Sequence, residues 1–305
     1  MTIISEPQAQ IKVFPDFSEI DIQMKPYFDE LIRLNPPQGS EYNFTNIFIW
    51  RNLYGFSVCR IDGALCIKGT DRSGMEFFMI MAQDADAYVN AIRHLVSAYK
   101  KEGKTFILSR VEERFLEPLK QAFPSMVYED DRDNADYVYL ASDLIGLRGR
   151  KYDGKRNHIK KFKEKYTYEY ADMSERLTGD CIRLAETWYH SKHDPSLEAD
   201  LIATREALTH YTQLGLKGSA ILIDGVVRAF SITEPLNPDT AVIHIEKYDP
   251  AYEGIPQVIN QQLCEHICGV YKYINREQDL GNQGLRRSKM SYNPVFILNK
   301  YRVCI

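Results

Sequence analysis

The sequence predicts an α/β (α+β) fold with two tandem domains, each built on a mixed and mostly antiparallel sheet. Two observations support this prediction. The pairs Asp62-Gly63 and Asp224-Gly225 each join two β-prone runs, as in a tight hairpin. Each hairpin is followed by a third β-prone run and then by a long helix. A chain of 305 residues is long enough to bury two cores, and we assign the domains to residues 1–145 and 146–305.

The first half begins with two helices and continues into the first hairpin. Pro36-Pro37 ends the first helix, because proline lacks the backbone N–H that a helix needs. Asp84 begins a long helix that stops before Gly103. We expect helices at Tyr27–Leu34, Asn43–Leu53, Asp84–Lys101 and Glu112–Ala122, and strands at Phe56–Ile61, Ala64–Lys68, Met75–Met81, Thr105–Ser109, Met126–Glu129 and Tyr137–Ala141.

The second half repeats this pattern around the second hairpin. Helices, then antiparallel strands through a tight turn, then alternating helix and strand form the element order of an N-acyltransferase fold. We expect helices at Lys155–Tyr166, Leu177–His190, Leu197–Leu214, Ile255–Cys268 and Leu285–Ser291, and strands at Thr167–Ala171, Gly218–Ile223, Val226–Thr233, Ala241–Tyr248, Val270–Ile274 and Val295–Val303.

Composition and charge exclude several classes of function. The net charge of −4 gives no general attraction for nucleic acid or anionic membrane, so we expect no DNA partner. No apolar run approaches the roughly 20 residues of a membrane helix, and the first residues do not resemble a signal peptide. The six cysteines form no CxxC pair, and Cys264 and Cys268 are expected to be buried helical residues rather than metal ligands. We therefore expect a reduced, cytoplasmic protein without a metal site, of unspecified oligomeric state.

A basic segment runs from Arg148 to Lys165. It holds nine Lys and Arg residues against two acidic ones, while Ile159 and Phe162 share one helical face. A solvated helix is one interpretation. The other is an anion site, because cations at a helix N-terminus oppose the helix dipole unless an anion is held there. The candidate ligands for a phosphate-bearing substrate such as CoA, a tRNA backbone, a nucleotide sugar or a lipid headgroup are Arg148, Arg150, Lys151, Lys155 and Arg156.

A second polar block, residues 275–279, follows an aromatic β-prone run and precedes a glycine-punctuated turn. So much mixed-sign polarity between two strands indicates a site at a strand end. The alternative is an ion-pair network that rigidifies this end. The substrate-binding candidates here are Asn275, Arg276, Glu277 and Asp279, with Arg286 from the basic piece that follows.

Acyl transfer needs a base for the nucleophile and a donor for the developing oxyanion. Alternation along the strand Ala241–Tyr248 places His244 and Glu246 on one face, with Glu246 as base and His244 as its partner. Exposure on a sheet edge, or pairing with Arg228, is the alternative. Lys289 and Arg286 are candidate oxyanion or phosphate ligands, and Tyr292 is a candidate proton donor to the leaving group or else a packed ring.

Two segments together resemble a known family. They are Leu147-Arg-Gly-Arg-Lys-Tyr-Asp-Gly-Lys-Arg-Asn-His-Ile-Lys-Lys-Phe162, and Asn275-Arg-Glu-Gln-Asp-Leu-Gly followed by Leu285-Arg-Arg-Ser-Lys-Met-Ser-Tyr-Asn-Pro294. They look like an uncharacterised bacterial family related to the C-terminal domain of phosphatidylglycerol lysyltransferases. The resemblance covers most of the chain. It implies two tandem GNAT-like domains, similar to the Fem aminoacyltransferases, and transfer of an acyl or aminoacyl group to an amine or hydroxyl.

The resemblance also guides the choice of catalytic residue and donor. Fem enzymes carry a lysine in a short helix before the last strand, and Lys289 is the position that matches it. The multi-span membrane domain of the lysyltransferases has no counterpart here, which disfavours a membrane-lipid substrate. The loop Tyr248–Pro256 has two prolines where CoA enzymes have a glycine-rich pyrophosphate loop, so acyl-CoA is disfavoured as well.

The leading hypothesis is therefore a transferase without a permanently bound cofactor that uses an activated acyl or aminoacyl donor, with aminoacyl-tRNA as the favoured one. The competing hypothesis is a non-catalytic module that kept the fold and binds a phosphorylated ligand or RNA.

Overall fold

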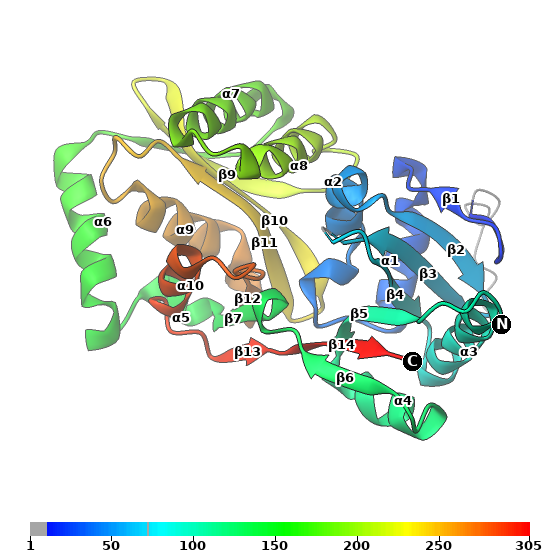
Figure 1. Ribbon diagram of the computed structural model, residues 1–305. Coiled ribbons are helices and arrows are strands. Elements are labelled where there is room, and N and C mark those ends of the chain that lie inside the picture. Colours follow the sequence, from blue (N-terminus) through cyan, green and yellow to red (C-terminus); the bar gives the residue numbers. More distant parts are fainter. Residues whose placement is uncertain (1–10, 72) are drawn as a thin grey trace. The chain divides into compact units, whose positions relative to one another are not determined.

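The structure, a computed structural model, describes residues 11–71 and 73–305 (Figure 1). It consists of two compact units. Unit 1 comprises the described residues up to Asp136 together with Leu298–Ile305, and unit 2 comprises Tyr137–Ile297. Each unit contains a seven-stranded sheet in which most neighbouring strands are antiparallel. The expected combination of α and β elements around two mostly antiparallel sheets is therefore present.

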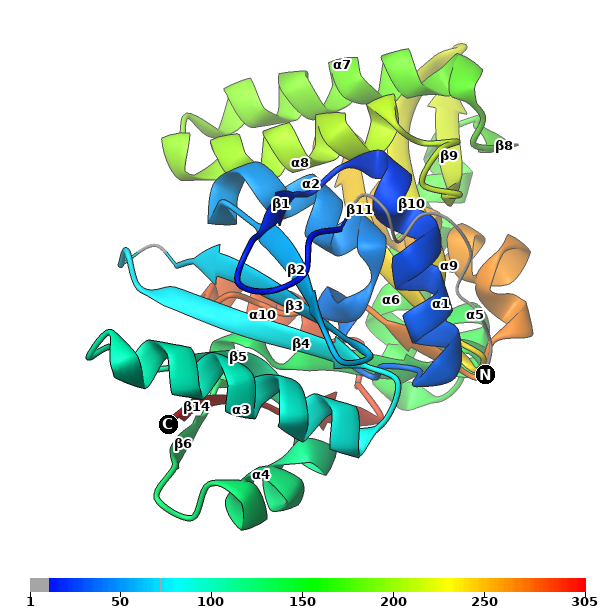
Figure 2. The same ribbon diagram turned by 90° about the vertical axis from the view of Figure 1, so that its right-hand side faces the viewer.

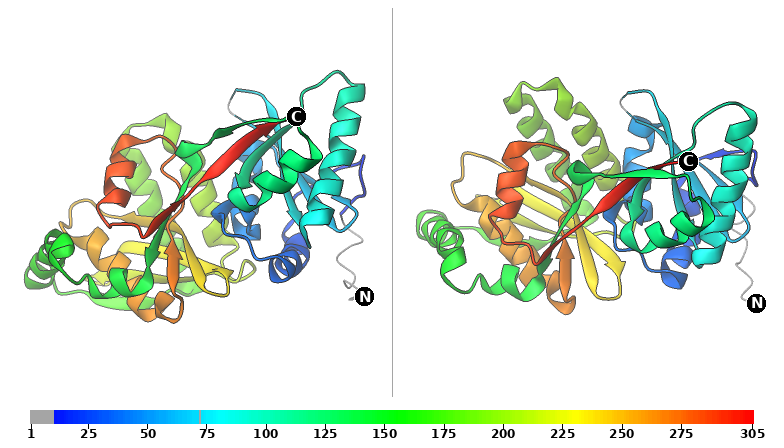
Figure 3. Two further views of the ribbon diagram at one scale, coloured as in Figure 1. Left: turned by 90° about the horizontal axis from the view of Figure 1, so that it is seen from below. Right: turned by 60° about the horizontal axis from the view of Figure 1, so that its bottom comes forward.

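Unit 1 has the strand order β1-β2-β3-β4-β5-β14-β6. The hairpin between β2 and β3 turns at Asp62 and Gly63, which both have positive φ, the backbone conformation that such a turn requires. Strand β14, near the C-terminus, lies between β5 and β6 (Figure 3). The strands are β1 (Ser18–Glu19), β2 (Ser57–Ile61), β3 (Ala64–Thr70), β4 (Glu76–Ala82), β5 (Ile107–Glu112), β6 (Val127–Asp130) and β14 (Lys300–Cys304), and the helices are α1 (Lys25–Leu34), α2 (Phe44–Tyr54), α3 (Ala85–Lys101) and α4 (Leu116–Ala122).

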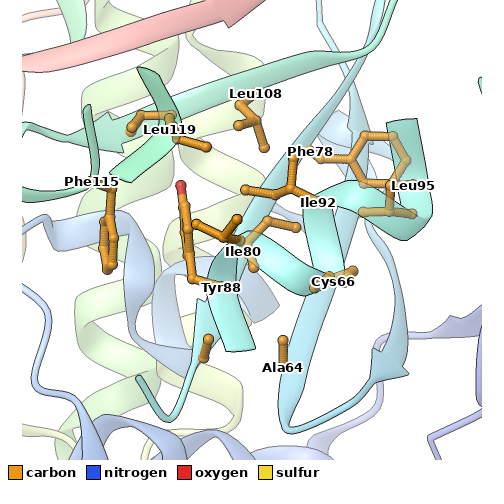
Figure 4. Packing of buried hydrophobic residues seen from close by; sticks show 14 of the residues in the cluster. Ala64, Cys66, Phe78, Ile80, Tyr88, Ile92, Leu95, Leu108, Phe115 and Leu119 are labelled. Carbon is orange, nitrogen blue, oxygen red and sulfur yellow. The ribbon is translucent and has the colours of Figure 1, made fainter. Parts of the chain in front are cut away.

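The core of unit 1 forms where α3 packs along the sheet (Figure 2). Asp84 caps this helix, since its carboxylate accepts a hydrogen bond from the backbone N of Ala87 at 2.8 Å. The ring of Tyr88 stacks on that of Phe115 with centroids 4.0 Å apart (Figure 4). The buried apolar residues of α3, among them Ala91, Leu95 and Val96, lie on the side of the helix that packs on the sheet.

Unit 2 has the strand order β13-β7-β12-β11-β10-β9-β8. Helices α7 and α8 lie on one side of its sheet, and α9, which contacts α5 and α6, lies on the other (Figure 1). The strands are β7 (Asp136–Leu140), β8 (Glu169–Asp172), β9 (Lys217–Ile223), β10 (Val226–Asn237), β11 (Thr240–Tyr248), β12 (Tyr273–Asn275) and β13 (Phe296–Leu298), and the helices are α5 (Ala141–Gly146), α6 (Asp153–Lys165), α7 (Glu175–Lys192), α8 (Glu198–Thr209), α9 (Ile255–His266) and α10 (Gln283–Met290).

The fold differs from the sequence expectation near both ends of unit 2. The single strand expected at Val295–Val303 is two strands in different sheets, β13 beside β7 and β14 beside β5. The strand expected at Tyr137–Ala141 is followed by an unexpected helix, α5, which is too short to show a helical period in the sequence. The structure divides the chain after Asp136 and assigns residues 298–305 to unit 1, whereas the sequence pattern predicts a boundary after residue 145. Residues 137–140 and 298–305 are both strand-like in sequence, and the alternation of apolar and polar residues alone does not reveal which sheet a strand joins.

Candidate active site

The parallel pair β11–β12 brings the candidate residues to one end of the unit 2 sheet. Pairing runs from Thr240 opposite Tyr273 to Val242 opposite Asn275. Strand β12 ends there, whereas β11 continues to Tyr248. The chain after Asn275 therefore leaves the sheet beside the second half of β11. Ligands of open α/β sheets commonly bind outside such carboxyl ends of parallel strands.

Most of the polar block 275–279 serves to fold its own turn. The Asn275 side chain accepts a hydrogen bond from the backbone N of Glu277 at 2.8 Å, and Glu277 adopts a positive φ of 56°. The backbone N of Arg276 donates to the carbonyl of Tyr137 at 2.9 Å. The ammonium of Lys289 donates to the carbonyls of Arg276 and of Gln278, the latter at 2.6 Å. Lys289, our candidate for an oxyanion ligand, thus holds this turn from α10.

Asp279 and Arg286 form a latch at the end of the same turn. The carboxylate of Asp279 is fully buried and accepts hydrogen bonds from Nε and Nη2 of Arg286 at 2.8 and 2.9 Å. It also accepts from the hydroxyl of Tyr137 and from the backbone N of Gly281. Burial would raise the pKa of Asp279, but these donors outweigh burial and hold it well below the ordinary value. For these two residues the structure matches the alternative of a rigidifying ion pair.

His244 is not placed as the partner of Glu246. Its side chain is 1% exposed and lies between two carboxylates, with Nδ1 2.8 Å from Glu277 and Nε2 2.8 Å from Glu234. Burial alone would lower the pKa of His244, but the two hydrogen-bonded carboxylates raise it to about 10. His244 is therefore an imidazolium at neutral pH. Exposure on a sheet edge is not found, because β11 lies between β10 and β12. Pairing with Arg228 is not found either, because Arg228 pairs with Asp249 at 3.2 Å.

Side chains from distant parts of unit 2 meet around the ring of Tyr292. Nη2 of Arg276 donates to both oxygens of Glu246 at 3.3 Å, and Nδ2 of Asn260 on α9 donates to Oε2 of Glu246 at 3.2 Å. The guanidinium carbon of Arg276 lies 4.9 Å from the centroid of the Tyr292 ring. The ammonium of Lys155, from the basic segment, lies 3.9 Å from the same centroid. We call these five residues, Lys155, Glu246, Asn260, Arg276 and Tyr292, the Tyr292 cluster.

The Tyr292 cluster combines two cations with one carboxylate. Burial lowers the pKa of Lys155, and the charge of Arg276 lowers it further. Burial opposes the charge of Arg276, but the carboxylate of Glu246 holds its pKa above the ordinary value. Burial raises the pKa of Tyr292 well above its ordinary value, so its hydroxyl keeps its proton at neutral pH. The cluster therefore offers a proton acceptor, a protonated phenol and positive charge in one place.

The rest of the basic segment divides into engaged and exposed side chains. Arg156 folds back on the start of α6, donating to the carbonyls of residues 147 and 149 and to the carboxylate of residue 153. Lys151 pairs with Asp143 at 3.2 Å. Arg148 and Arg150 are exposed to solvent. Of the five cations predicted to bind phosphate, Lys155 is the one that joins the Tyr292 cluster.

The loop before α9 is tightly packed and internally bonded. Gly254 has a φ of 89°, and a Cβ at this position would lie 2.5 Å from the carbonyl oxygen of His158 in α6. The backbone N of Ile255 donates to Tyr252, and those of residues 257 and 258 donate to Gly254, each at 3.2 Å. Pro256, as a proline, has no backbone N–H to donate. The backbone donors of residues 255, 257 and 258 are thus engaged within the protein rather than open to a pyrophosphate.

Three residues of the site were missed in the sequence. Asn260 is a polar residue, 1% exposed, on the apolar face of α9, and that misplaced polarity was a usable signal. Glu234 follows the expected end of its strand by one residue and therefore escaped notice. Tyr137, whose backbone and hydroxyl both hold the polar turn, looked like an ordinary strand tyrosine.

The structure and its comparison with known proteins assign this chain first to a fold class and then to a family. Two tandem units, each with a mixed sheet and a parallel pair, define a tandem GNAT-like acyltransferase fold. The chain belongs to the family described as "Phosphatidylglycerol lysyltransferase, C-terminal", whose sequence model matches residues 32–304. The resemblance inferred from the basic segment and the polar block is thus confirmed.

Solved structures share the fold, and one curated relative matches part of the chain. A conserved protein of unknown function from Bacteroides thetaiotaomicron VPI-5482 is 31% identical, with 95% of this chain and 99% of that chain covered and a TM-score of 0.86. L-PGS from Bacillus licheniformis (14% identity, 88% and 93% coverage, TM-score 0.62) and FemX (9%, 94% and 96%, 0.60) share the fold. An uncharacterised Mycoplasmoides gallisepticum protein, MYCGA3080, is 26% identical over 192 residues, which span 62% of this chain and 61% of that protein. In the part of the chain that the structure describes, no helix is long and apolar enough to cross a membrane.

Proposed function

We propose that this protein transfers an activated acyl or aminoacyl group to an amine or hydroxyl acceptor at the Tyr292 cluster. The observation that carries the proposal is that two segments more than 100 residues apart, each singled out for its polarity, meet there through Lys155 and Arg276. Membership of the lysyltransferase C-terminal family and the shared fold of L-PGS and FemX support a transferase.

The chemistry follows from the groups in the cluster. Glu246 accepts the proton of the attacking amine or hydroxyl, whose lone pair forms the new bond to the acyl carbon. The bond between this carbon and the leaving oxygen of the donor breaks as the intermediate collapses. Tyr292 returns a proton to that oxygen, since its hydroxyl is protonated at neutral pH. Lys289 contributes by holding the turn that presents Arg276 rather than by contacting the reacting atoms.

An aminoacyl-tRNA is the donor we propose, ahead of acyl-CoA. At the start of α9 the backbone donors of residues 255, 257 and 258 are engaged, Pro256 supplies none and α6 packs against Gly254, which makes this loop poorly suited to a pyrophosphate. Lys160 pairs with Glu164 at 3.7 Å, and beyond it helix α6 exposes three further lysines, a surface that suits a phosphate backbone. They are Lys161, Lys163 and Lys165.

A donor-consumption assay tests the proposed function. The protein would be incubated with a panel of charged tRNAs and acyl-CoAs carrying a labelled acyl group, and loss of label from the donor would be measured. Wild type should consume an aminoacyl-tRNA, and Glu246→Gln should be slower by roughly 100-fold to 10,000-fold, the range for loss of a general base. The matched control is Glu253→Gln, which removes an exposed carboxylate on the nearby loop and should leave the rate unchanged.

The competing function, a binding module that does not catalyse transfer, predicts a different pattern. It predicts tRNA affinity with a steep salt dependence, reflecting several phosphate contacts, but no donor consumption by wild type. Absence of both binding at low salt and consumption would contradict both functions.

A further inference from the structure

Arg276 has a buried nitrogen that the protein itself does not use. Its Nη2 donates to Glu246, as described above. Its Nη1 is buried and, within residues 11–71 and 73–305, meets no hydrogen-bond acceptor. A charged donor that is removed from water without an acceptor is unfavourable, so such an atom in a native site points to a missing partner. The polar turn is held by several hydrogen bonds, and Arg276, the side chain that this turn places in the cluster, is the one with the unused donor.

A second cation, Lys155, lies over the same aromatic ring, and its acceptor within the described part of the chain is a neutral hydroxyl. Lys155 is half-buried, and its ammonium donates to the hydroxyl oxygen of Ser291 at 2.7 Å. That hydroxyl in turn donates to the carbonyl of Ser288 at 2.6 Å. Burial and the nearby Arg276 both disfavour the charged form of Lys155 in the structure as it stands. An anion between the two cations would stabilise both charges.

The carboxylates around the cluster are already engaged. Asp279 is paired with Arg286 and Asp143 with Lys151, while Glu277 and Glu234 share the charge of His244. Glu246 neutralises one of the two cations of the cluster. Lys155, Arg276 and Glu246 together therefore carry one excess positive charge.

We propose that a monoanionic oxyanion of the bound substrate, a phosphodiester or a carboxylate, contacts Nη1 of Arg276 and the ammonium of Lys155 beside the ring of Tyr292. The oxygens of either group accept hydrogen bonds from two separate cations, and one negative charge balances the cluster. This inference rests on the proposed function, because the molecule that bears the anion is one of the two substrates of the transfer. It adds that this substrate is anchored by an anionic group beside the transferred acyl carbon.

Small anions test this contact without any knowledge of the natural substrate. The full chain, in low-salt buffer free of phosphate, would be titrated with dimethyl phosphate, with acetate and with chloride by calorimetry or by protein NMR. Saturable one-to-one binding of one of the two oxyanions is expected, with chloride binding more weakly. Tighter binding of dimethyl phosphate identifies a phosphodiester, and tighter binding of acetate identifies a carboxylate.

Variants of two lysines on α6 locate the site. Lys155→Gln should weaken the oxyanion by roughly tenfold to 100-fold, the effect of losing one charged hydrogen bond. Lys160→Gln removes an exposed lysine that lies 3.7 Å from Glu164 and should leave binding unchanged. The proposal is overturned if no oxyanion saturates the protein, or if both variants bind as wild type does.

Chemical modification of lysines tests the same contact in the wild-type protein. An amine-reactive reagent followed by peptide mass spectrometry would report the modification of Lys155 against that of Lys160. The bound oxyanion should protect Lys155 several-fold and leave Lys160 unprotected, and equal modification with and without the anion would contradict the proposal. Anion binding without donor consumption would overturn the proposed function alone, whereas donor consumption without anion binding would overturn this inference alone.

Discussion

Replacing His244 with glutamine removes a buried positive charge from between two carboxylates. Glutamine keeps polar atoms near Glu234 and Glu277 but leaves their negative charges facing each other without compensation. The pKa of His244 is raised from an ordinary 6.5 to about 10 in the folded chain. Since the folded state binds this proton more tightly, the resulting stabilisation is fully present below pH 6.5 and is lost as the pH rises through about 10.

The size of the effect follows from these two pKa values. Linkage gives a contribution of about 4 kcal/mol to the free energy of unfolding at pH 6.5 and about 1 kcal/mol at pH 9.5. The difference in stability between wild type and His244→Gln should therefore shrink by roughly 3 kcal/mol over this range. Other groups titrate at high pH in both proteins, so the difference between them isolates the histidine.

The two tryptophans allow each unit to be followed separately. Trp50 lies in α2 of unit 1 and Trp188 in α7 of unit 2. In a Trp50→Phe background, the fluorescence of Trp188 reports urea unfolding of unit 2, which need not unfold together with unit 1. The control is His266→Gln, which changes an exposed histidine on α9 and should leave the pH dependence unaltered. A stability difference between wild type and His244→Gln that stays constant from pH 6.5 to 9.5 would refute the reasoning.

Three further predictions concern the latch, a buried acid and a glycine. Asp279→Asn should destabilise unit 2 by about 3 kcal/mol, because it leaves the guanidinium of the latch without its buried carboxylate; a change under 1 kcal/mol in urea unfolding would contradict this role. Burial raises the pKa of Glu41 to about 7, so the stability of unit 1 should fall as the pH rises from 4.5 through 7, and Glu41→Gln should flatten that slope when the tryptophan of unit 1 is followed. Gly254→Ala should cost about 2 kcal/mol or more, since its Cβ would meet a backbone oxygen at 2.5 Å on a backbone with positive φ, and an unchanged melting temperature would show that the loop relaxes.

The elements that a local signal defines were predictable from the sequence. Asp84, Asp62-Gly63 and Asp224-Gly225 mark a cap and two turns, and the structure has a helix start and two hairpins there. The long amphipathic helices follow their apolar period. The division of the last strand between two sheets was not predictable, because strand pairing depends on which distant edge is free.

In the candidate site, likewise, the sequence did not predict which side chains are partners. Polarity identified residues 275–279 and the basic segment, yet sequence alone did not reveal that most of the polar block folds its own turn while Arg276 enters the cluster. Residues at i and i+2 share a strand face, as expected for His244 and Glu246, but their partners come from other elements. Charge pairing over such distances is decided by packing rather than by local pattern.

The proposal that the Tyr292 cluster catalyses transfer is tested most directly by the rate of donor consumption for wild type and for Glu246→Gln under identical conditions. We predict that wild type consumes a labelled aminoacyl-tRNA and that the variant, folded to the same extent by circular dichroism, is slower by roughly 100-fold or more. Equal rates for the two proteins would contradict the assignment of this site, and a wild type that consumes none of the donors would contradict the proposed activity.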